Sequence, residues 1–182
     1  MCIRDSMRHA QNSQIAAVSP GNYGLDFMKE TYGYDLDASV KCSNFIGETI
    51  DMAVECGFEK MLLTGHIGKL VKVSGGIMNT HSRHSDARAE LMCAHALRSG
   101  ADLETAKAIL ETITTEEAME IIRMHGLQDA VMEQMAEKVH QYMQHRVEGA
   151  IQTEAILFSN RFGYLGETKG AEKLAEKFKY DL

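Results

Sequence analysis

The residues best suited to chemistry lie in one stretch, GHIGKLVKVSGGIMNTHSRHSDAR, residues 65–88. It carries four cationic side chains against one acid, a local formal charge of +3, whereas the whole chain carries −7. The cations are Lys69, Lys72, Arg83 and Arg88, and the acid is Asp86. Because lysine and arginine form strong, oriented hydrogen bonds with carboxylates, the stretch predicts an anion-binding site in an otherwise acidic protein.

Glycines and small polar residues in this stretch would let a ligand approach the backbone closely. Gly65 and Gly68 flank a predicted helix N-terminus, whose free N–H groups attract anions. The pair Gly75-Gly76 allows a tight backbone approach. Asn79 and Thr80 add neutral hydrogen-bonding groups. A polycarboxylate ligand would use all of these features at once.

Two other chemistries fit the stretch less well. A nucleotide phosphate loop needs glycine where Leu63 stands and a hydroxyl residue where Leu70 stands, so that interpretation is rejected. His81, His84 and Asp86, with His66, could instead hold catalytic zinc, which leaves a metal-dependent hydrolase as the alternative function. The His-x-x-His pattern is weak, however, and solvated histidines are more common.

A cysteine nucleophile has little support. Cys42, Cys93 and His66 could meet in space, but nothing in their spacing predicts it. The four cysteines show no CxxC pair, which is typical of free thiols in a reducing cytoplasm. The net charge of −7 argues against nucleic-acid and anionic-membrane partners, and no apolar run approaches the ~20 residues of a membrane span. A homo-oligomer stays possible.

The elements that must position these residues alternate along the chain. Strand-like segments at 13–22, 38–44, 60–66 and 154–160 are separated by segments of helical period. Strands separated by helices predict a helix-rich α/β single domain with a small, mainly parallel sheet. The leader MCIRDS, residues 1–6, matches nothing that follows, so we expect it to be artefactual and the domain to span residues 7–182.

Helix boundaries follow from capping residues and apolar spacing. Ser43 and Ser85 are predicted to cap helices that end at Gly57 and Gly100. Thr114 and Glu117 form the pattern of a capping box. Further helices are expected at 25–33, at 103–113, along the stripe Leu127, Val131, Met135, Val139 and Met143, and at 169–178.

Each predicted strand ends in small polar residues or glycine. These ends are Ser19-Pro20-Gly21-Asn22, Ser43-Asn44, Thr64-Gly65-His66 and Ser159-Asn160. In a parallel sheet they would collect along one edge, where ligands normally bind. Asn22, Ser43 and Asn44 therefore join the candidate binding residues.

Three segments carry a resemblance to a known family. PGNYG (20–24), KCSNFIGETID (41–51) and LLTGHIGKLVKVSGGIMNTHSRHSDARAE (62–90) closely resemble the C-terminal part of the cobalt-precorrin-5B C(1)-methyltransferase family of anaerobic cobalamin biosynthesis. The likeness runs from about Ser13 to the C-terminus. Members of that family begin with a threonine- and glycine-rich N-terminal half, which this chain does not contain.

The resemblance implies methyl transfer from S-adenosylmethionine to C-1 of a tetrapyrrole, giving cobalt-precorrin-6A. Cobalt would enter only within the substrate, and no metal site of the protein is implied. The acetate and propionate carboxylates of that substrate would explain the clustered cations. A proton acceptor at the ring carbon is expected among His66, His81 and Asp86.

Overall fold

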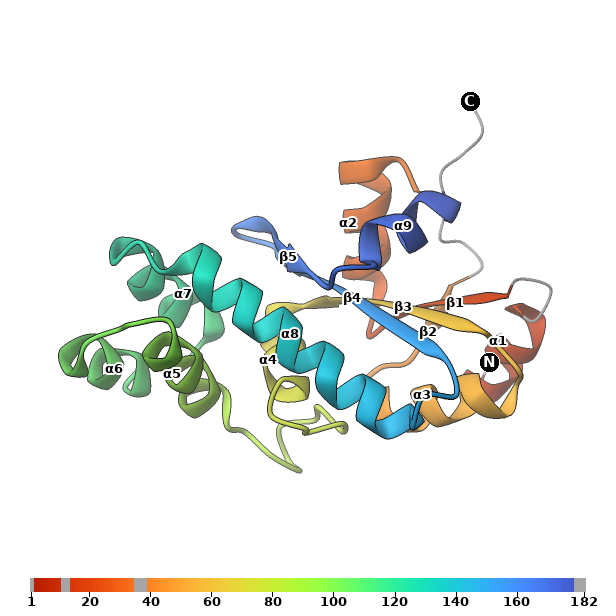
Figure 1. Ribbon diagram of the computed structural model, residues 1–182, viewed down its shortest axis with the longest axis horizontal. Coiled ribbons are helices and arrows are strands. Elements are labelled where there is room, and N and C mark those ends of the chain that lie inside the picture. The colour runs from red at the N-terminus through yellow and green to blue at the C-terminus, as the bar shows by residue number, and fades with distance from the viewer. Residues whose placement is uncertain (1, 11–13, 35–38, 179–182) are drawn as a thin grey trace.

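The structure is a computed structural model that describes residues 2–10, 14–34 and 39–178. Within these residues, five strands form one sheet in the order β2-β1-β3-β4-β5 (Figure 1). The strands are β1 (Ile15–Ser19), β2 (Val40–Lys41), β3 (Lys60–His66), β4 (Gln152–Ser159) and β5 (Gly163–Glu167). The first four run parallel, and β5 pairs antiparallel with β4. The predicted helix-rich α/β fold with a mainly parallel sheet is confirmed.

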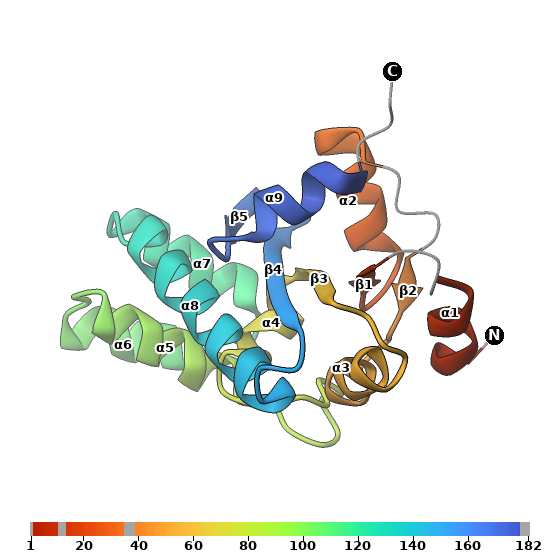
Figure 2. The same cartoon turned by 45° about the vertical axis from the view of Figure 1, so that its right-hand side comes forward.

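Helices cover both faces of this sheet. On one face lie α2 (Asn22–Tyr32) and α9 (Ala171–Ala175), which is followed by a short 3-10 turn at Glu176–Phe178. On the other face lie α3 (Ile46–Glu55), α4 (Ile67–Val73) and the long α8 (Gln128–Val147), while α1 (Ile3–Ala10) packs beside β2 and α3 (Figure 2).

The central strand shows why this layering forms. Met61 and Leu63 point into the larger hydrophobic cluster, beneath α3, α4 and α8, whereas Leu62 points into the smaller one, beneath α2 and α9. All three are essentially inaccessible to solvent. A strand buried on both faces reads as a continuous apolar run, and this explains why residues 60–66 could be predicted from sequence.

Three further helices, α5 (Arg88–Arg98), α6 (Leu103–Leu110) and α7 (Thr115–Met124), pack together and extend beyond the sheet beside α8 (Figure 1). The predicted capping box is confirmed: Thr114 accepts a hydrogen bond from the Glu117 backbone, and Glu117 accepts one from Thr114. In α8, Val131, Met135 and Val139 are fully buried, as their four-residue spacing predicts.

Several predicted boundaries were wrong. Ser43 does not cap α3; it has a positive φ of 53°, and the helix begins at Ile46 after Phe45. Ser85 does not cap α5, which begins three residues later. The helix predicted to reach Ile113 ends at Leu110, and the last one begins at Ala171 instead of residue 169. Residues 13 and 38, within two of the predicted strands, lie outside the described residues.

Strand β5 and helix α1 were not among the predicted elements. Strand β5 was missed because its sequence, GYLGE, contains two glycines and an acid in five residues. Residues 3–6 of the expected leader are the first half of α1, where Arg4 pairs with Glu55 at 2.9 Å. Met7, in the same helix, is completely buried.

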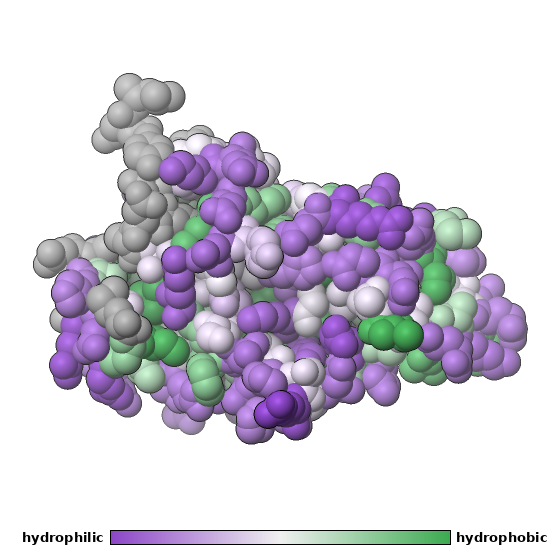
Figure 3. Space-filling view, turned by 180° about the vertical axis from the view of Figure 1, so that it is seen from behind, coloured by the Kyte–Doolittle hydropathy of each residue, from purple (hydrophilic) through white to green (hydrophobic). Residues whose placement is uncertain are grey.

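On the side seen in Figure 3, the hydrophobic residues of the described part of the chain are scattered among polar ones. No helix in the described part of the chain combines the length and apolarity needed to cross a membrane.

Candidate active site

Two adjoining cavities open at the edge where the parallel strands end. The first, which we call the basic cavity, has a volume of about 480 Å³ and lies between the ends of β3 and β4, the 79–82 loop, Arg88 and the start of α7. The second, the turn cavity, has a volume of about 450 Å³ and is lined by the Ser19–Gly24 turn, Asp26 and Phe158. Tyr23, His66 and Lys69 line both. The predicted pocket at the strand ends is therefore present in the structure.

The strand order explains why the cavities lie here. From β1 the chain continues to β2 on one side, and then returns to β3 on the other side of β1. This reversal separates the connections above the carboxyl ends of β1 and β3 and opens a crevice at that point.

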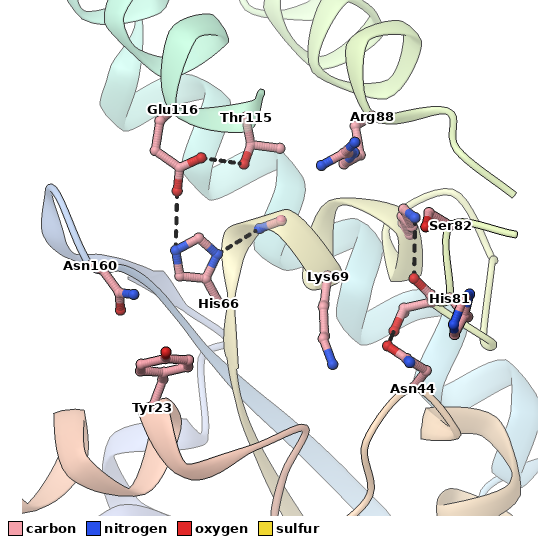
Figure 4. Close-up of a pocket in the computed structure, with 13 residues that line it drawn as sticks. Tyr23, Asn44, His66, Lys69, His81, Ser82, Arg88, Thr115, Glu116 and Asn160 are labelled. Atoms are coloured by element: carbon pink, nitrogen blue, oxygen red, sulfur yellow. Dashed lines mark hydrogen bonds and ion pairs between the residues drawn. The ribbon is translucent and has the colours of Figure 1, made fainter. Parts of the chain in front are cut away.

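His66, the last residue of β3, has both ring nitrogens engaged (Figure 4). Its Nδ1 accepts a hydrogen bond from the Gly68 backbone N–H at 3.1 Å, so the proton of the neutral ring is on Nε2. Nε2 faces Glu116 Oε1 at 3.1 Å. Burial lowers the pKa of His66, and Lys69 adds to this effect, while the Glu116 carboxylate opposes it. His66 is therefore a neutral ring that donates to Glu116.

Glu116 reaches this edge from the first turn of α7. Its Oε2 accepts a hydrogen bond from the Thr115 hydroxyl at 3.0 Å, and its Oε1 receives the His66 contact. Each carboxylate oxygen can accept a further hydrogen bond. Glu116 is thus a positioned carboxylate in the wall of the basic cavity, with acceptor capacity left.

Lys69, in the first turn of α4, extends into the space between Tyr23 and Asn44 (Figure 4). Its ammonium donates one hydrogen bond, to the Ser43 carbonyl at 3.1 Å. The positive φ of Ser43 belongs to the turn that presents this carbonyl. Burial lowers the pKa of Lys69. An ammonium has three donors, so Lys69 retains two for a ligand.

Lys72 has a different role from Lys69, although it is one helical turn away. It is 2% exposed, and its ammonium donates to the backbone carbonyls of Thr80 and Ser85 at 3.1 and 2.9 Å. Asp86 lies 3.9 Å from it. Burial lowers the pKa of Lys72, partly offset by Asp86. Lys72 ties the 80–86 loop to α4.

Arg88 and Asp86 form a bidentate pair. Nε and Nη2 of Arg88 donate to the two carboxylate oxygens at 2.7 and 2.8 Å. These bonds hold the pKa of Asp86 below its usual range and raise that of Arg88. Both oxygens of Asp86 are thus occupied, while Arg88 still lines the basic cavity.

The 79–82 loop is held by the turn that follows β2. Phe45 and Asn79 form an isolated bridge, and the Thr80 N–H donates to the Asn44 carbonyl at 2.9 Å. The Thr80 hydroxyl donates to Asn44 Oδ1 at 3.3 Å. Asn79 Oδ1 accepts the His81 N–H at 3.2 Å. The structure therefore brings Ser43, Asn44, Asn79 and Thr80 together, and of these Asn44 and Thr80 line the basic cavity.

His81 lines the basic cavity, and its Nδ1 accepts the Arg83 N–H at 3.1 Å. The neutral ring therefore carries its proton on Nε2, where it can donate to a ligand. Arg83 and His84 are exposed, and neither lines either cavity. The described residues contain no group of three His, Cys, Asp or Glu side chains that could hold a metal ion, so the metal-hydrolase alternative has no support.

Gly68 lines the basic cavity, and Gly21 and Gly24 line the turn cavity, whereas Gly65, Gly75 and Gly76 serve packing. A Cβ on Gly75 would come within 2.6 Å of the Leu91 side chain, and one on Gly65 within 2.9 Å of Leu70. Gly76 has a φ of +80° and lies against Tyr142. These three residues let the chain turn closely against α5, α8 and α4.

Asn22 lines the turn cavity only. Sequence reasoning did not select five residues that line the basic cavity: Tyr23, Ser82, Thr115, Glu116 and Asn160. A signal existed for three of them: the capping box placed Thr115 and Glu116 at a helix start, and Asn160 was the polar end of a predicted strand. That α7 comes back to β3 could not be inferred from local pattern.

The cysteines are not placed for nucleophilic chemistry. Cys42 is completely buried, and burial raises the pKa of its thiol to about 12. Cys93 is also buried, with its pKa raised by burial. The structure contains no disulfide bond among the described cysteines.

Together, these observations define an α/β domain with a cleft at the carboxyl edge of its sheet. Residues 79–169 match the family model described as CbiD, C-terminal domain. The chain belongs to this family.

Curated relatives agree with this assignment. The chain is 43% identical over 155 residues to the cobalt-precorrin-5B C(1)-methyltransferase of Ruminiclostridium cellulolyticum, covering 85% of this chain and 40% of that protein. It is 38% identical over 173 residues to the protein of the same name from Alkaliphilus metalliredigens, covering 95% and 46%. It is 36% identical over 181 residues to the protein of the same name from Clostridioides difficile, and the match covers 98% of this chain and 44% of that protein. The chain thus spans less than half the length of these relatives. No solved structure gave a significant match.

Proposed function

We propose that this chain forms the ligand cleft of a C-methyltransferase that transfers a methyl group from S-adenosylmethionine to C-1 of cobalt-precorrin-5B, giving cobalt-precorrin-6A. The relatives carry the name of this reaction. The observation that supports it in the structure is the basic cavity, where Lys69 and Arg88 offer donors beside neutral groups of Asn44 and Thr80. Such a wall suits a ring edged by carboxylates.

The charge of the cavity is smaller than the residue count suggests. Lys69, Lys72 and Arg88 supply three positive charges, and Asp86 and Glu116 remove two, so one remains uncompensated. Lys69 is the one of these three cations that no described acid pairs with, because Asp86 pairs with Arg88 and lies 3.9 Å from Lys72. We therefore assign the main carboxylate contact to Lys69, with Arg88 and the Nε2–H of His81 as further donors.

When bound, S-adenosylmethionine supplies a methyl group whose carbon–sulfur bond breaks with its electron pair left on sulfur, as C-1 forms the new carbon–carbon bond and the positive charge passes to the ring. Release of one proton from the ring balances that charge. We assign proton acceptance to Glu116. The three candidates from sequence fit less well, because Nδ1 of His66 and of His81 already accepts a backbone N–H, and because Asp86 is paired with Arg88 and lines neither cavity.

His66 then acts as a positioning residue. It donates to Glu116 and so orients the carboxylate, while its own Nδ1 is fixed by the backbone of α4. A displacement at a methyl carbon depends strongly on alignment, and a misplacement of about 1 Å can cost ~100-fold in rate.

The relatives are more than twice as long as the matched part of this chain. We therefore expect the 182-residue chain to bind the tetrapyrrole but to turn it over slowly. We further propose that the protein acts in the cytoplasm on this small-molecule substrate, with no nucleic-acid or membrane partner. A homo-oligomer is compatible with this proposal.

The test is an equilibrium titration of the purified chain with cobalt uroporphyrin, a stable cobalt tetrapyrrole that bears acetate and propionate groups. The change in its main visible absorption band reports binding. We expect saturable binding that weakens with salt, because the contacts are ionic. A nucleoside triphosphate in excess should not compete. Absence of binding by the folded chain, or displacement by the triphosphate, would contradict the proposal.

A further inference from the structure

The turn cavity has a composition that differs from that of the basic cavity. Its walls are the backbone turn from Ser19 to Gly24, the carboxylate of Asp26 and the ring of Phe158. Phe158 is 1% exposed and stacks on Phe27 with ring centroids 4.6 Å apart and an interplanar angle of 9°. The His66 ring meets it edge-on at 5.6 Å. The cavity thus has a rigid aromatic wall, formed before any ligand binds.

Two glycines shape the opposite wall. A Cβ on Gly24 would come within 2.8 Å of the Thr64 carbonyl, so only glycine lets α2 pack this closely over β1 and β3. Gly21 is different: it lines the cavity, and a Cβ there would meet nothing within 4 Å. Its backbone is extended, with φ of −177°, so a side chain at this position would cause no backbone strain. A larger side chain at this cavity-lining position would therefore be tolerated by the fold.

Position and charge indicate which ligand. The cavity lies at the reversal of strand order between β1 and β3, where nucleotide-like ligands bind in open α/β sheets. Its volume of about 450 Å³ falls within the ~300–1,000 Å³ of small-molecule sites. The charged residues that line the turn cavity are Asp26 and Lys69, whereas Lys69, Lys72 and Arg88 line the basic cavity against one acid, Glu116. A methyl donor with a net positive charge is therefore repelled less by the turn cavity than by the basic cavity. A polycarboxylate is attracted more strongly by the basic cavity than by the turn cavity.

We propose that the turn cavity binds the nucleoside portion of the methyl donor, and that the donor and the tetrapyrrole meet at Tyr23, His66 and Lys69, the residues lining both cavities. This rests on the proposed function. Phe158 forms the apolar wall for the base, and Asp26 accepts hydrogen bonds from hydroxyl or ammonium groups of the donor. Tyr23, which is 69% exposed, lies where the two ligands meet, opposite Glu116 (Figure 4).

The test measures binding and does not depend on turnover. Isothermal titration calorimetry of the 182-residue chain with S-adenosylhomocysteine gives the affinity for the nucleoside, and the cobalt uroporphyrin titration gives that for the tetrapyrrole. Gly21→Leu fills the turn cavity, and Glu30→Leu places the same side chain elsewhere on α2 as a control. We expect Gly21→Leu to weaken S-adenosylhomocysteine binding by at least about tenfold and to leave the tetrapyrrole affinity unchanged, with Glu30→Leu altering neither.

Circular dichroism first establishes that each variant is folded. If Gly21→Leu is not folded, Asp26→Ala takes its place, with the same expectation. Binding of S-adenosylhomocysteine that Gly21→Leu or Asp26→Ala leaves intact would overturn the inference and leave the proposed function standing. So would a chain that binds cobalt uroporphyrin but no S-adenosylhomocysteine, because the donor site would then lie outside this chain. A chain that binds neither would overturn the inference and the proposed function together.

Discussion

The two lysines of the GKLVK segment should differ sharply when each is replaced by methionine. Methionine keeps the unbranched stem and removes the ammonium. In Lys72→Met, the carbonyls of Thr80 and Ser85 lose a buried, charged donor. In Lys69→Met, only the Ser43 carbonyl loses a partner, at a site that solvent can reach. We therefore expect Lys72→Met to destabilise the fold and Lys69→Met to spare it.

The size of the effect follows from the contacts. A hydrogen bond that involves a charged group contributes roughly 1.5–3 kcal/mol, so two such bonds sum to about 3–6 kcal/mol. Burial of the Lys72 ammonium, which lowers its pKa, costs part of this, and methionine removes that cost. The net loss for Lys72→Met is then about 2–4 kcal/mol, or roughly 5–15 °C in melting temperature for a domain of this size. For Lys69→Met we expect a loss of no more than about 1 kcal/mol.

The assay is guanidinium chloride unfolding followed by circular dichroism, because the chain contains no tryptophan. Both variants and the unmodified chain are measured at the same pH and salt concentration. If Lys72→Met and Lys69→Met unfold at the same midpoint, Lys72 is not the tie that holds the 80–86 loop. A Lys72→Met protein of full stability that lost tetrapyrrole binding would show instead that Lys72 contacts the ligand.

Three further predictions concern titratable groups. Burial lowers the pKa of His95 to about 4, so between pH 6.5 and 4 the unfolded chain gains a proton that the folded chain does not. Acidification over this range should therefore lower the free energy of unfolding by roughly 3 kcal/mol. Denaturant titrations across the range should show a smaller loss for His95→Leu. The Cys42 thiol, with its pKa near 12, should resist a thiol reagent at pH 8 until the chain unfolds, whereas exposed Cys2 should react at once; equal labelling rates would refute its burial. Glu116→Gln should lower the pKa of His66 further, because the Glu116 carboxylate raises it. NMR titration of the imidazole measures this pKa, and an unchanged value would contradict the pairing of His66 with Glu116.

Local patterns predicted those parts of the fold that depend on local physics. The run KMLLTGH, with its apolar Met61, Leu62 and Leu63, is buried on both faces and forms the central strand, and the Thr114–Glu117 capping box starts a helix as expected. Ser43 and Ser85 do not cap helices because tertiary contacts hold their backbone. The Ser43 carbonyl accepts a hydrogen bond from Lys69, and the Ser85 carbonyl accepts one from Lys72. Tertiary contacts of this kind cannot be inferred from the spacing of residues in the sequence.

The candidate site was predicted in outline only. Clustered cations and polar strand ends correctly indicated a cleft at one edge of the sheet. Counting charged residues overestimated the positive charge available to a ligand, because Arg88 is paired with Asp86 and Lys72 is buried under the loop. Glu116 is 50 residues from His66 in sequence and came into the site only through the packing of α7.

The central claim is that the basic cavity holds the carboxylates of a tetrapyrrole, with Lys69 as the main contact. The most direct measurement compares the dissociation constant of cobalt uroporphyrin for Lys69→Met and for Lys107→Met. Lys107 is exposed on α6, lines neither cavity and matches the charge that is removed. Loss of one charge-assisted bond should cost about 1.5–3 kcal/mol, so Lys69→Met should bind roughly ten- to a hundredfold more weakly while Lys107→Met binds as the unmodified chain does. Equal dissociation constants for both variants, each shown to be folded, would contradict the account.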